Sequence, residues 1–248
     1  MTTHTQTRRS PQRMALRRII AMEIVSGVGD GVFWVGLVAI LFRLDVGPAG
    51  FAAAVVVRLG PRALFGAPAG VIVDMVDRRR LLVGLDLGRG ICMIVLAVIA
   101  GNGVGEFGLL IVVLVTYVLA APYRPAVTAG LALLTSEEFL SAANAQVNTV
   151  RQIMTFVGPL IGAAVVKWGT PESAFWLNAV TFVLAGALVG SIRALSVPRS
   201  PRLTSATALP RRWSRVFGNA GTDRPERPGL RHVLRAWQRT RVVRVGRR

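Results

Sequence analysis

The apolar residues of this chain fall into six long blocks separated by short polar or glycine-rich turns. Each block approaches the roughly 20 residues that a helix needs to cross about 30 Å of hydrocarbon. Buried helices of a soluble protein are the alternative, but a soluble fold does not need six such blocks in succession. The pattern therefore predicts an all-α, polytopic membrane protein with six transmembrane helices. These helices are expected at residues 19–42, 49–73, 81–100, 107–129, 141–166 and 172–192.

The segments outside these blocks define the domain organisation. Residues 1–18 form a basic N-terminus, residues 19–193 the transmembrane bundle, and residues 194–248 a basic tail rich in Pro, Ser and Arg. We expect the tail to be mostly disordered, because its like charges repel one another and it has few apolar residues. One apolar stripe predicts a short amphipathic helix near residues 229–238.

The basic residues are unevenly distributed, and their distribution predicts the orientation. Of the formal net charge of +18, +13 lies in residues 193–248, where 15 basic residues accompany 2 acidic ones. Arginines also precede the first helix and fill the turn after the second, whereas the opposite turns hold only Arg43 and Lys167. Positive loops stay inside, so we expect both termini to be cytoplasmic in a multi-pass protein of the cell membrane. The tail then contacts anionic lipid of the bilayer, and no nucleic acid is expected as a partner.

Few residues are suited to catalysis or to metal binding. Cys92 is the single cysteine and lies in an apolar block, while His4 and His232 lie in opposite tails. The Gly-x-Gly-x-Gly run at residues 27–31 lies inside a predicted membrane helix, and no strand precedes it, so it is no dinucleotide loop. No nucleophile–base pair or Walker-type lysine loop is visible. We therefore expect no enzyme, no metal site and no cofactor, and any pumping must draw on an ion gradient or a partner.

Several charged residues lie inside the predicted helices, where charge is costly and normally faces the bundle interior. At 1.5 Å per residue, Asp30 and Arg62 lie about 17 Å from the cytoplasmic ends of their helices and Arg151 about 15 Å. These three could neutralise one another, or they could form a proton- or substrate-responsive site, because protonating Asp30 would free a positive charge. A purely structural ion pair is the alternative. Glu23, nearer the cytoplasmic end, is a weaker candidate for proton binding.

The most informative motif lies at the end of the second predicted helix and in the turn that follows. It reads Gly70-Val-Ile-Val-Asp74-Met-Val-Asp77-Arg78-Arg79-Arg80. A glycine four residues before an aspartate, followed by a basic cluster, resembles the helix 2–3 signature of the major facilitator superfamily. Gly70 would let the helix end pack closely, and Asp74 would anchor a partner's charge or helix N-terminus and so gate one face. Met75 and Asp77 depart from the signature, and a positive-inside turn with an incidental aspartate is the alternative.

The fifth predicted helix carries a second segment, Gly158-Pro159-Leu-Ile-Gly162-Ala163. It resembles the end of the antiporter signature of the same superfamily, although Met154 occupies the place of an upstream glycine. Proline removes a backbone donor and glycine permits close packing, so this stretch could bend or hinge the helix.

Two further helices carry charges of interest. Pro122 and Pro125 should interrupt the fourth helix near its end. Arg124, between them, is a candidate for a cytoplasmic gate, with a simple positive-inside anchor as the alternative. Asp86 and Arg89 are three residues apart in the third helix and therefore share one of its faces.

Three shorter stretches indicate one branch of the superfamily. They are Ser26-Gly-Val-Gly29-Asp30, Leu59-Gly-Pro61-Arg62 and Ala142-Ala-Asn144-Ala. They resemble the secretion-effector branch, which includes enterobactin-type siderophore exporters and macrolide efflux proteins. The resemblance covers residues 19–193 and implies one six-helix bundle of the two that enclose a transport pathway in this superfamily.

This resemblance implies a secondary transporter that exports a small amphipathic molecule in exchange for protons. A seventh helix does not follow, so we expect a half or truncated chain that is completed by a second six-helix bundle, either a homodimer partner or a separate chain. The alternative is a non-transporting membrane remnant or a membrane interaction protein.

Overall fold

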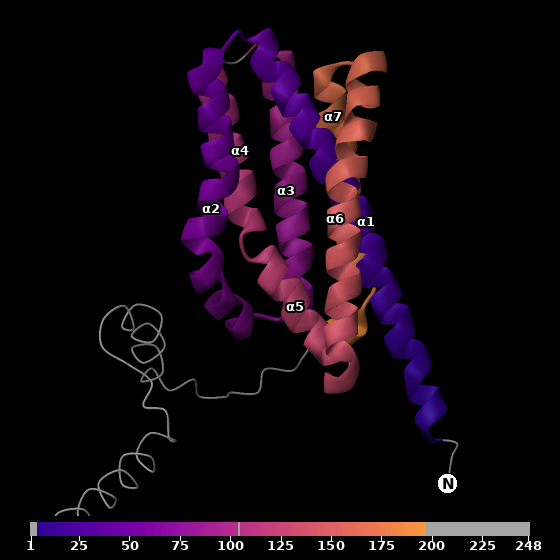
Figure 1. Ribbon diagram of the computed structural model, residues 1–248. Helices are drawn as coiled ribbons and strands as arrows, with labels where there is room; N and C mark the ends of the chain where they lie inside the picture. The colour runs from indigo at the N-terminus through magenta and orange to yellow at the C-terminus, as the bar shows by residue number, and fades with distance from the viewer. Residues whose placement is uncertain (1–3, 104, 197–248) are drawn as a thin grey trace, which may run out of the picture. The chain divides into compact units, whose positions relative to one another are not determined.

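The computed structural model describes residues 4–103 and 105–196, of which residues 4–12, 67, 68, 71 and 74 are described by their backbone only. This part of the chain folds into seven α-helices and a final 3₁₀ turn (Figure 1). The elements are α1 (His4–Arg43), α2 (Gly47–Met75), α3 (Arg78–Gly101), α4 (Glu106–Ala120), α5 (Tyr123–Leu134), α6 (Glu137–Trp168), α7 (Pro171–Gly190) and η1 (Arg193–Leu195).

Six stretches within the described residues are long and apolar enough to cross a membrane, with α4 and α5 together forming one of them. The predicted all-α bundle with six transmembrane helices is therefore confirmed. The stretches are Arg13–Arg43, Gly47–Gly66, Arg78–Gly101, Glu106–Leu134, Glu137–Trp168 and Pro171–Gly190. The predicted disorder and amphipathic helix of the tail fall almost entirely on residues 197–248, which lie outside the described residues.

The helix edges follow from capping and breaking residues. The α-helix is interrupted between Ala120 and Tyr123, as the two prolines predict. Pro125 then sits in the first turn of α5, where a missing N–H leaves no helical bond unmade. At the other end of the chain α1 begins at His4, well before the predicted residue 19. Hydropathy detects only the apolar part of a helix, whereas Arg and Gln continue it readily.

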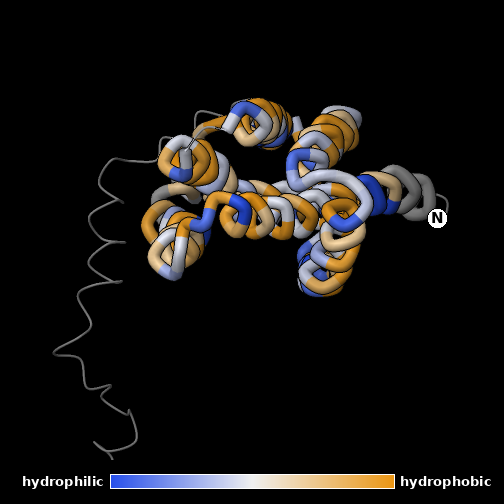
Figure 2. Tube along the Cα trace, turned by 90° about the horizontal axis from the view of Figure 1, so that it is seen from above, coloured by the Kyte–Doolittle hydropathy of each residue, from blue (hydrophilic) through white to orange (hydrophobic). Residues whose placement is uncertain are grey.

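The described helices pack around α1, α3 and α7. Helix α1 lies along α6 and α7, α3 lies along α7 and α4, and α2 packs chiefly against α4 (Figure 1). Seen from above, apolar residues occur on all sides of the helices (Figure 2). Outward-facing Leu64, Phe107, Phe156 and Leu160 are exposed large apolar side chains of α2, α4 and α6. Such a surface is expected of helices that are solvated by lipid.

Two apolar clusters form the buried core. One includes Met22, Leu82, Leu131 and Val189, at the end where α7 finishes. The other surrounds Phe33 at the opposite end. The Phe33 ring lies 5.8 Å from the Phe175 ring and 6.2 Å from the Tyr117 ring, centroid to centroid. Along α1 and α3 the two clusters are separated by a short polar stretch, and this stretch holds the intramembrane charges.

Candidate functional site

A polar layer lies between the two apolar clusters. We define it by Glu23, Ser26 and Asp30 of α1, Asp86 and Arg89 of α3, and Arg151 of α6. Glu23, Ser26, Asp86 and Arg89 are buried, with Asp86 0% exposed, whereas the Asp30 side chain is 51% exposed. Charge is costly in a membrane-spanning segment, so these groups are expected to meet one another.

Glu23 and Arg151 form the tightest contact in the layer. The Arg151 Nε donates to Glu23 Oε2 at 2.7 Å, and its Nη2 donates to Oε1 at 2.5 Å. This two-point geometry is the strong form of an arginine–carboxylate pair, and it joins α1 to α6. From the sequence, mutual neutralisation of Asp30, Arg62 and Arg151 is one of the alternatives. In the structure Arg151 pairs with Glu23 instead. Asp30 lies two helical turns, about 10 Å, beyond Glu23 along α1, and Arg151 meets Glu23.

Arg89 lies among three polar groups and two rings. Its Nη2 donates to Ser26 Oγ at 3.1 Å and lies 3.9 Å from Asp30 Oδ1 and 3.8 Å from Asp86 Oδ1. The guanidinium carbon is 4.0 Å from the centre of the Phe182 ring and 4.8 Å from that of Tyr123. Cation–π contacts of this kind help to stabilise a buried guanidinium.

Three of the predicted site charges lie on the surface of the described bundle. Asp30, Arg62 and Arg124 are exposed, and they come from α1, α2 and α5. Arg124 lies within electrostatic range of Arg62, Arg151 and Glu23. Helix α6 adds exposed polar side chains, namely Asn148, Gln152 and Thr155. We call these residues the charged face. Hydrocarbon would solvate this face poorly, so it must meet water or protein.

The turn between α2 and α3 caps the start of α3 and contacts the end of α7. Asp77 is the N-cap of α3, and its Oδ1 accepts a hydrogen bond from the Arg80 amide at 2.9 Å. Arg79 Nε donates to the Gly190 carbonyl at 2.8 Å, and Arg18 Nη1 donates to the Ser191 carbonyl at 3.0 Å. Two arginines therefore bind carbonyls at the C-terminal end of α7, where the helix dipole favours positive charge.

Gly70, the glycine of the predicted gating motif, is not closely packed in the described chain. A Cβ built on Gly70 would meet no atom within 4 Å, so the expected close packing at Gly70 is wrong for this bundle. The nearby Ala69 and Val73 are buried, so this end of α2 packs through residues other than Gly70. Arg78 is half-buried and Arg80 exposed, and Asp74 is described by its backbone only.

The glycines of the predicted hinge lie at a helix crossing. A Cβ built on Gly158 would lie 2.9 Å from the Gly31 Cα, and one on Gly162 would lie 2.9 Å from the Val32 Cα. A Cβ on Gly27 would meet the Met154 Cβ at 2.7 Å. Small residues four apart on two helices allow this close approach in membranes. Helix α6 continues through Pro159, so Gly158 and Gly162 serve here to bring α6 against α1.

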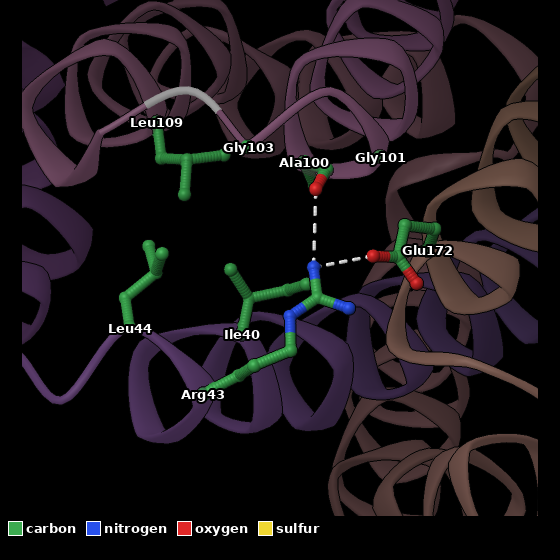
Figure 3. A pocket seen from close by; sticks show the side chains of 8 residues that line it. All are labelled: Ile40, Arg43, Leu44, Ala100, Gly101, Gly103, Leu109 and Glu172. Atoms are coloured by element: carbon green, nitrogen blue, oxygen red, sulfur yellow. Dashed lines mark hydrogen bonds and ion pairs between the residues drawn. The ribbon is translucent and has the colours of Figure 1, made fainter.

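A pocket of about 220 Å³ lies at the end of the bundle where α1 finishes. It is lined by Ile40, Arg43, Leu44, Ala100, Gly101, Gly103, Leu109 and Glu172 (Figure 3). Arg43 Nη2 donates to the Ala100 carbonyl at 3.0 Å and forms an ion pair with Glu172, which ties α1 to α3 and α7. The pocket shares no residue with the polar layer, and drug-sized ligands occupy sites of roughly 300–1,000 Å³. It is therefore a junction of helix ends, separate from the polar layer.

Two pairs of site residues were not proposed from the sequence. The sequence placed Asp86 and Arg89 on one face of a helix, but it did not predict that the other buried charges gather around them. The signal for such a role was two opposite charges, three residues apart, within an apolar block. The second pair is Asn178 and Thr181 of α7, which are buried and hydrogen-bonded to each other at 2.8 Å. They pack against Gly29.

Within residues 4–103 and 105–196, no group of three or more His, Cys, Asp or Glu could hold a metal ion.

Comparisons with known proteins agree with this architecture. The sequence profile of the Major Facilitator Superfamily matches residues 19–243. An uncharacterized MFS-type transporter of Mycobacterium tuberculosis is 31% identical over 144 residues, which is 57% of this chain and 33% of that protein. Macrolide efflux protein A of Enterococcus faecalis is 30% identical over 145 residues, which is 58% of this chain and 43% of that protein.

A more distant relative extends the match along the chain. An uncharacterized MFS-type transporter of Bacillus subtilis is 24% identical over 179 residues, which is 70% of this chain and 41% of that protein. The chain thus spans less than half the length of each of these three relatives. No solved structure gives a significant match. These findings confirm the resemblance inferred from the sequence motifs.

Proposed function

This chain belongs to the major facilitator superfamily, and from that premise we propose that it forms one half of a secondary transporter that exports small amphipathic molecules in exchange for protons. Family membership points to transport rather than to catalysis of a chemical reaction. The observation that carries the proposal is the charged face, where Asp30, Arg62 and Arg124 are exposed within membrane-spanning segments. Charges in such positions mark pathways for ions and substrates.

A second six-helix bundle is the partner that this face requires. Placed against α2, α5 and α6, it would cover the exposed charges and leave a water-filled cavity between the two bundles. The second bundle comes either from another copy of the chain or from a separate chain.

The name of the macrolide efflux relative supports export as the direction of transport. The distribution of arginines supports a cell-membrane protein with both termini cytoplasmic.

We assign the coupling role to Asp30. Its half-exposed carboxylate can exchange protons with water in the cavity. Arg89 Nη2 lies 3.9 Å from Asp30 Oδ1, close enough for its position to depend on the charge of Asp30. Glu23 is less suited to this role, because both of its oxygens accept hydrogen bonds from Arg151. Arg62 and Arg124 then set the charge of the cavity wall. Arg18 and Arg79, which hold the end of α7, act at the cytoplasmic gate.

An accumulation assay tests this function. The chain is co-expressed with the second bundle of macrolide efflux protein A in a bacterium that lacks its main exporters, and copurification verifies assembly of the two. We expect lower cellular accumulation of a labelled macrolide, reversed by a protonophore. Asp30→Asn should abolish export while the amount in the membrane stays unchanged. Asp45→Asn is the matched control, because Asp45 is an exposed turn residue with φ of 52°, a conformation that Asn tolerates.

Two results would contradict the proposal. An assembled wild-type pair that leaves macrolide accumulation unchanged argues against export of this class of molecule. An Asp30→Asn protein that accumulates normally and still exports at the wild-type rate argues against the coupling role. A fall in the amount of Asp30→Asn protein in the membrane would instead indicate that Asp30 is a structural partner of Arg89.

A further inference from the structure

The polar layer contains an uneven number of charges. Its carboxylates are Glu23, Asp30 and Asp86, and its cations are Arg89 and Arg151. If all five were ionised, the layer would carry one uncompensated negative charge inside the membrane. Arginine stays protonated in proteins. A single proton on one of the carboxylates therefore makes the layer neutral.

The structure distinguishes the three carboxylates by their surroundings. Glu23 accepts two hydrogen bonds from Arg151. Donors of this kind stabilise the ionised form of a carboxyl group. Asp30 is half-exposed and can be hydrated. Asp86 is fully buried, and neither of its oxygens has a hydrogen-bond partner among the described residues. Burial without donors favours the neutral form of a carboxyl group most strongly at Asp86.

Arg89 lies almost equally far from the two aspartates. Its Nη2 is 3.9 Å from Asp30 Oδ1 and 3.8 Å from Asp86 Oδ1, so it forms a direct hydrogen bond with neither and is held by Ser26 and the flanking rings. A small displacement of the guanidinium would complete a hydrogen bond with one aspartate and lengthen the contact with the other. The charge of each aspartate therefore determines which of the two binds Arg89.

We propose that Asp86 is a buried proton-binding site, and that Arg89 couples its protonation to the charge of Asp30. When Asp30 is ionised, it balances Arg89, and Asp86 keeps its proton. When Asp30 is neutralised, by a proton or by a cationic ligand, Arg89 binds Asp86, and Asp86 releases its proton to water. This inference concerns the isolated bundle and does not depend on the proposed export.

Among the described residues, charged or titratable groups face Asp86 from three helices. Helix α1 contributes Glu23 and Asp30, α3 contributes Arg89, and α5 contributes Tyr123, which is buried. Helix α7 presents Gly186, whose built Cβ would lie 3.5 Å from the Asp86 Cβ, so no charge approaches from that side. Arg151 is already paired with Glu23. Arg89 is therefore the cation that can form an ion pair with an ionised Asp86.

Infrared spectroscopy of the purified chain in nanodiscs of ether-linked lipid, which has no ester carbonyl, tests the proposal directly. A protonated carboxylic acid has a carbonyl-stretch band that a carboxylate lacks. We expect this band at neutral pH in the wild-type protein and its loss in Asp86→Asn. We also expect its loss in Asp30→Asn, where the Asp86 carboxyl is intact but ionised. Asp45→Asn, in an exposed turn, should keep the band.

Each outcome decides one part of the proposal. A wild-type spectrum without the band, or a band that survives Asp86→Asn, overturns Asp86 as the protonated group. A band that disappears in Asp86→Asn but survives in Asp30→Asn overturns the coupling through Arg89. If Asp86→Asn does not accumulate, labelling of the aspartate carboxyls with carbon-13 in the wild-type protein shows whether the band shifts and thus belongs to an aspartate. A band that does not shift overturns the proposal.

Discussion

The buried charges of this bundle differ in how their loss of hydration is compensated. Glu23 receives two hydrogen bonds from a guanidinium, which is the strongest compensation available to a carboxylate. Arg89 has one hydrogen bond to Ser26 and two ring faces. Asp86 has no hydrogen-bond partner in the described part of the chain. Residues of one chemical type thus lose their hydration with different compensation, because their neighbours differ.

The first prediction concerns the Glu23–Arg151 pair. Arg151→Gln should lower the free energy of unfolding by about 3–5 kcal/mol, because it leaves a buried carboxylate without its counter-charge. Adding Glu23→Gln should recover much of this loss, since the remaining charge is removed. Unfolding in mixed detergent micelles measures both variants. Lys167→Gln, at an exposed position of the same helix, is the control and should stay within about 0.5 kcal/mol of the wild type.

A second prediction concerns the N-cap of α3. Asp77→Ala removes the acceptor of the Arg80 amide and should destabilise the first turn of α3 by about 1 kcal/mol. Asp77→Asn should keep most of the stability, because the amide oxygen can still accept. Hydrogen exchange of the Arg80 amide reports on this turn. Equal exchange rates in the Ala and Asn variants would contradict the capping role.

At the scale of the elements, α1 is packed on two sides through glycines. Gly27 and Gly31 face α6, while Gly29 and Gly36 face α7, where built Cβ atoms would collide with Thr181 Oγ1 and with the Ala174 Cβ. The two sets alternate along α1 because a helix turns by about 100° per residue. One glycine-rich stretch therefore lets two neighbouring helices approach the same helix closely.

The third prediction tests this crossing. Gly31→Ala should destabilise the bundle by roughly 1–3 kcal/mol, because its Cβ would lie 2.5 Å from the Gly158 Cα and backbone atoms cannot move aside. Gly84→Ala in α3 is the matched control, since a Cβ there meets nothing within 4 Å. It should be neutral or stabilising by up to about 1 kcal/mol, as alanine favours helix. Equal destabilisation by both variants would argue that helix propensity, rather than the crossing, explains the effect.

The sequence was sufficient to predict the elements but not their pairing. Hydropathy located the six membrane spans, and Pro122 and Pro125 located the break before Tyr123, because both are local properties. The partner of Arg151 is a different kind of property, since Glu23 lies 128 residues away and competes with Asp30 on the same helix. Depth alone placed Arg151 nearer to Asp30. Only the helix crossing shows that Glu23 is within reach.

At the scale of the whole bundle, α7 is fixed at both of its ends. Glu172 at its start pairs with Arg43 of α1, and the carbonyls at its end bind Arg18 of α1 and Arg79 of α3. Helices α1, α3 and α7 therefore form a unit joined by polar contacts at each membrane surface. Helix α2 packs mainly against α4 and reaches α1 through Arg58, whose guanidinium carbon lies 4.1 Å from the centre of the Trp34 ring.

A fourth prediction concerns the orientation of this bundle in the membrane. The arginines of residues 8–18 and 78–80 lie at one end, and we expect that end to be cytoplasmic. After Gly190, a fused reporter enzyme that works only in the cytoplasm should be active, and one that works only outside the cell should be inactive. A reporter fused after Gly101, at the opposite end of α3, should behave in the reverse way. Activity after Gly190 only in the exterior compartment would refute the predicted orientation.

The crossing of α1 and α6 has a consequence for synthesis of the chain. Ribosomes add roughly 5–20 residues per second, so about 6–25 s separate the synthesis of Glu23 from that of Arg151, 128 residues later. During this interval α1 is in the membrane with an uncompensated carboxylate and an uncovered glycine face. We expect the insertion machinery to retain α1 until α6 emerges. Site-specific crosslinks from Gly27 to that machinery should therefore persist in arrested chains that end before residue 151 and disappear in longer ones.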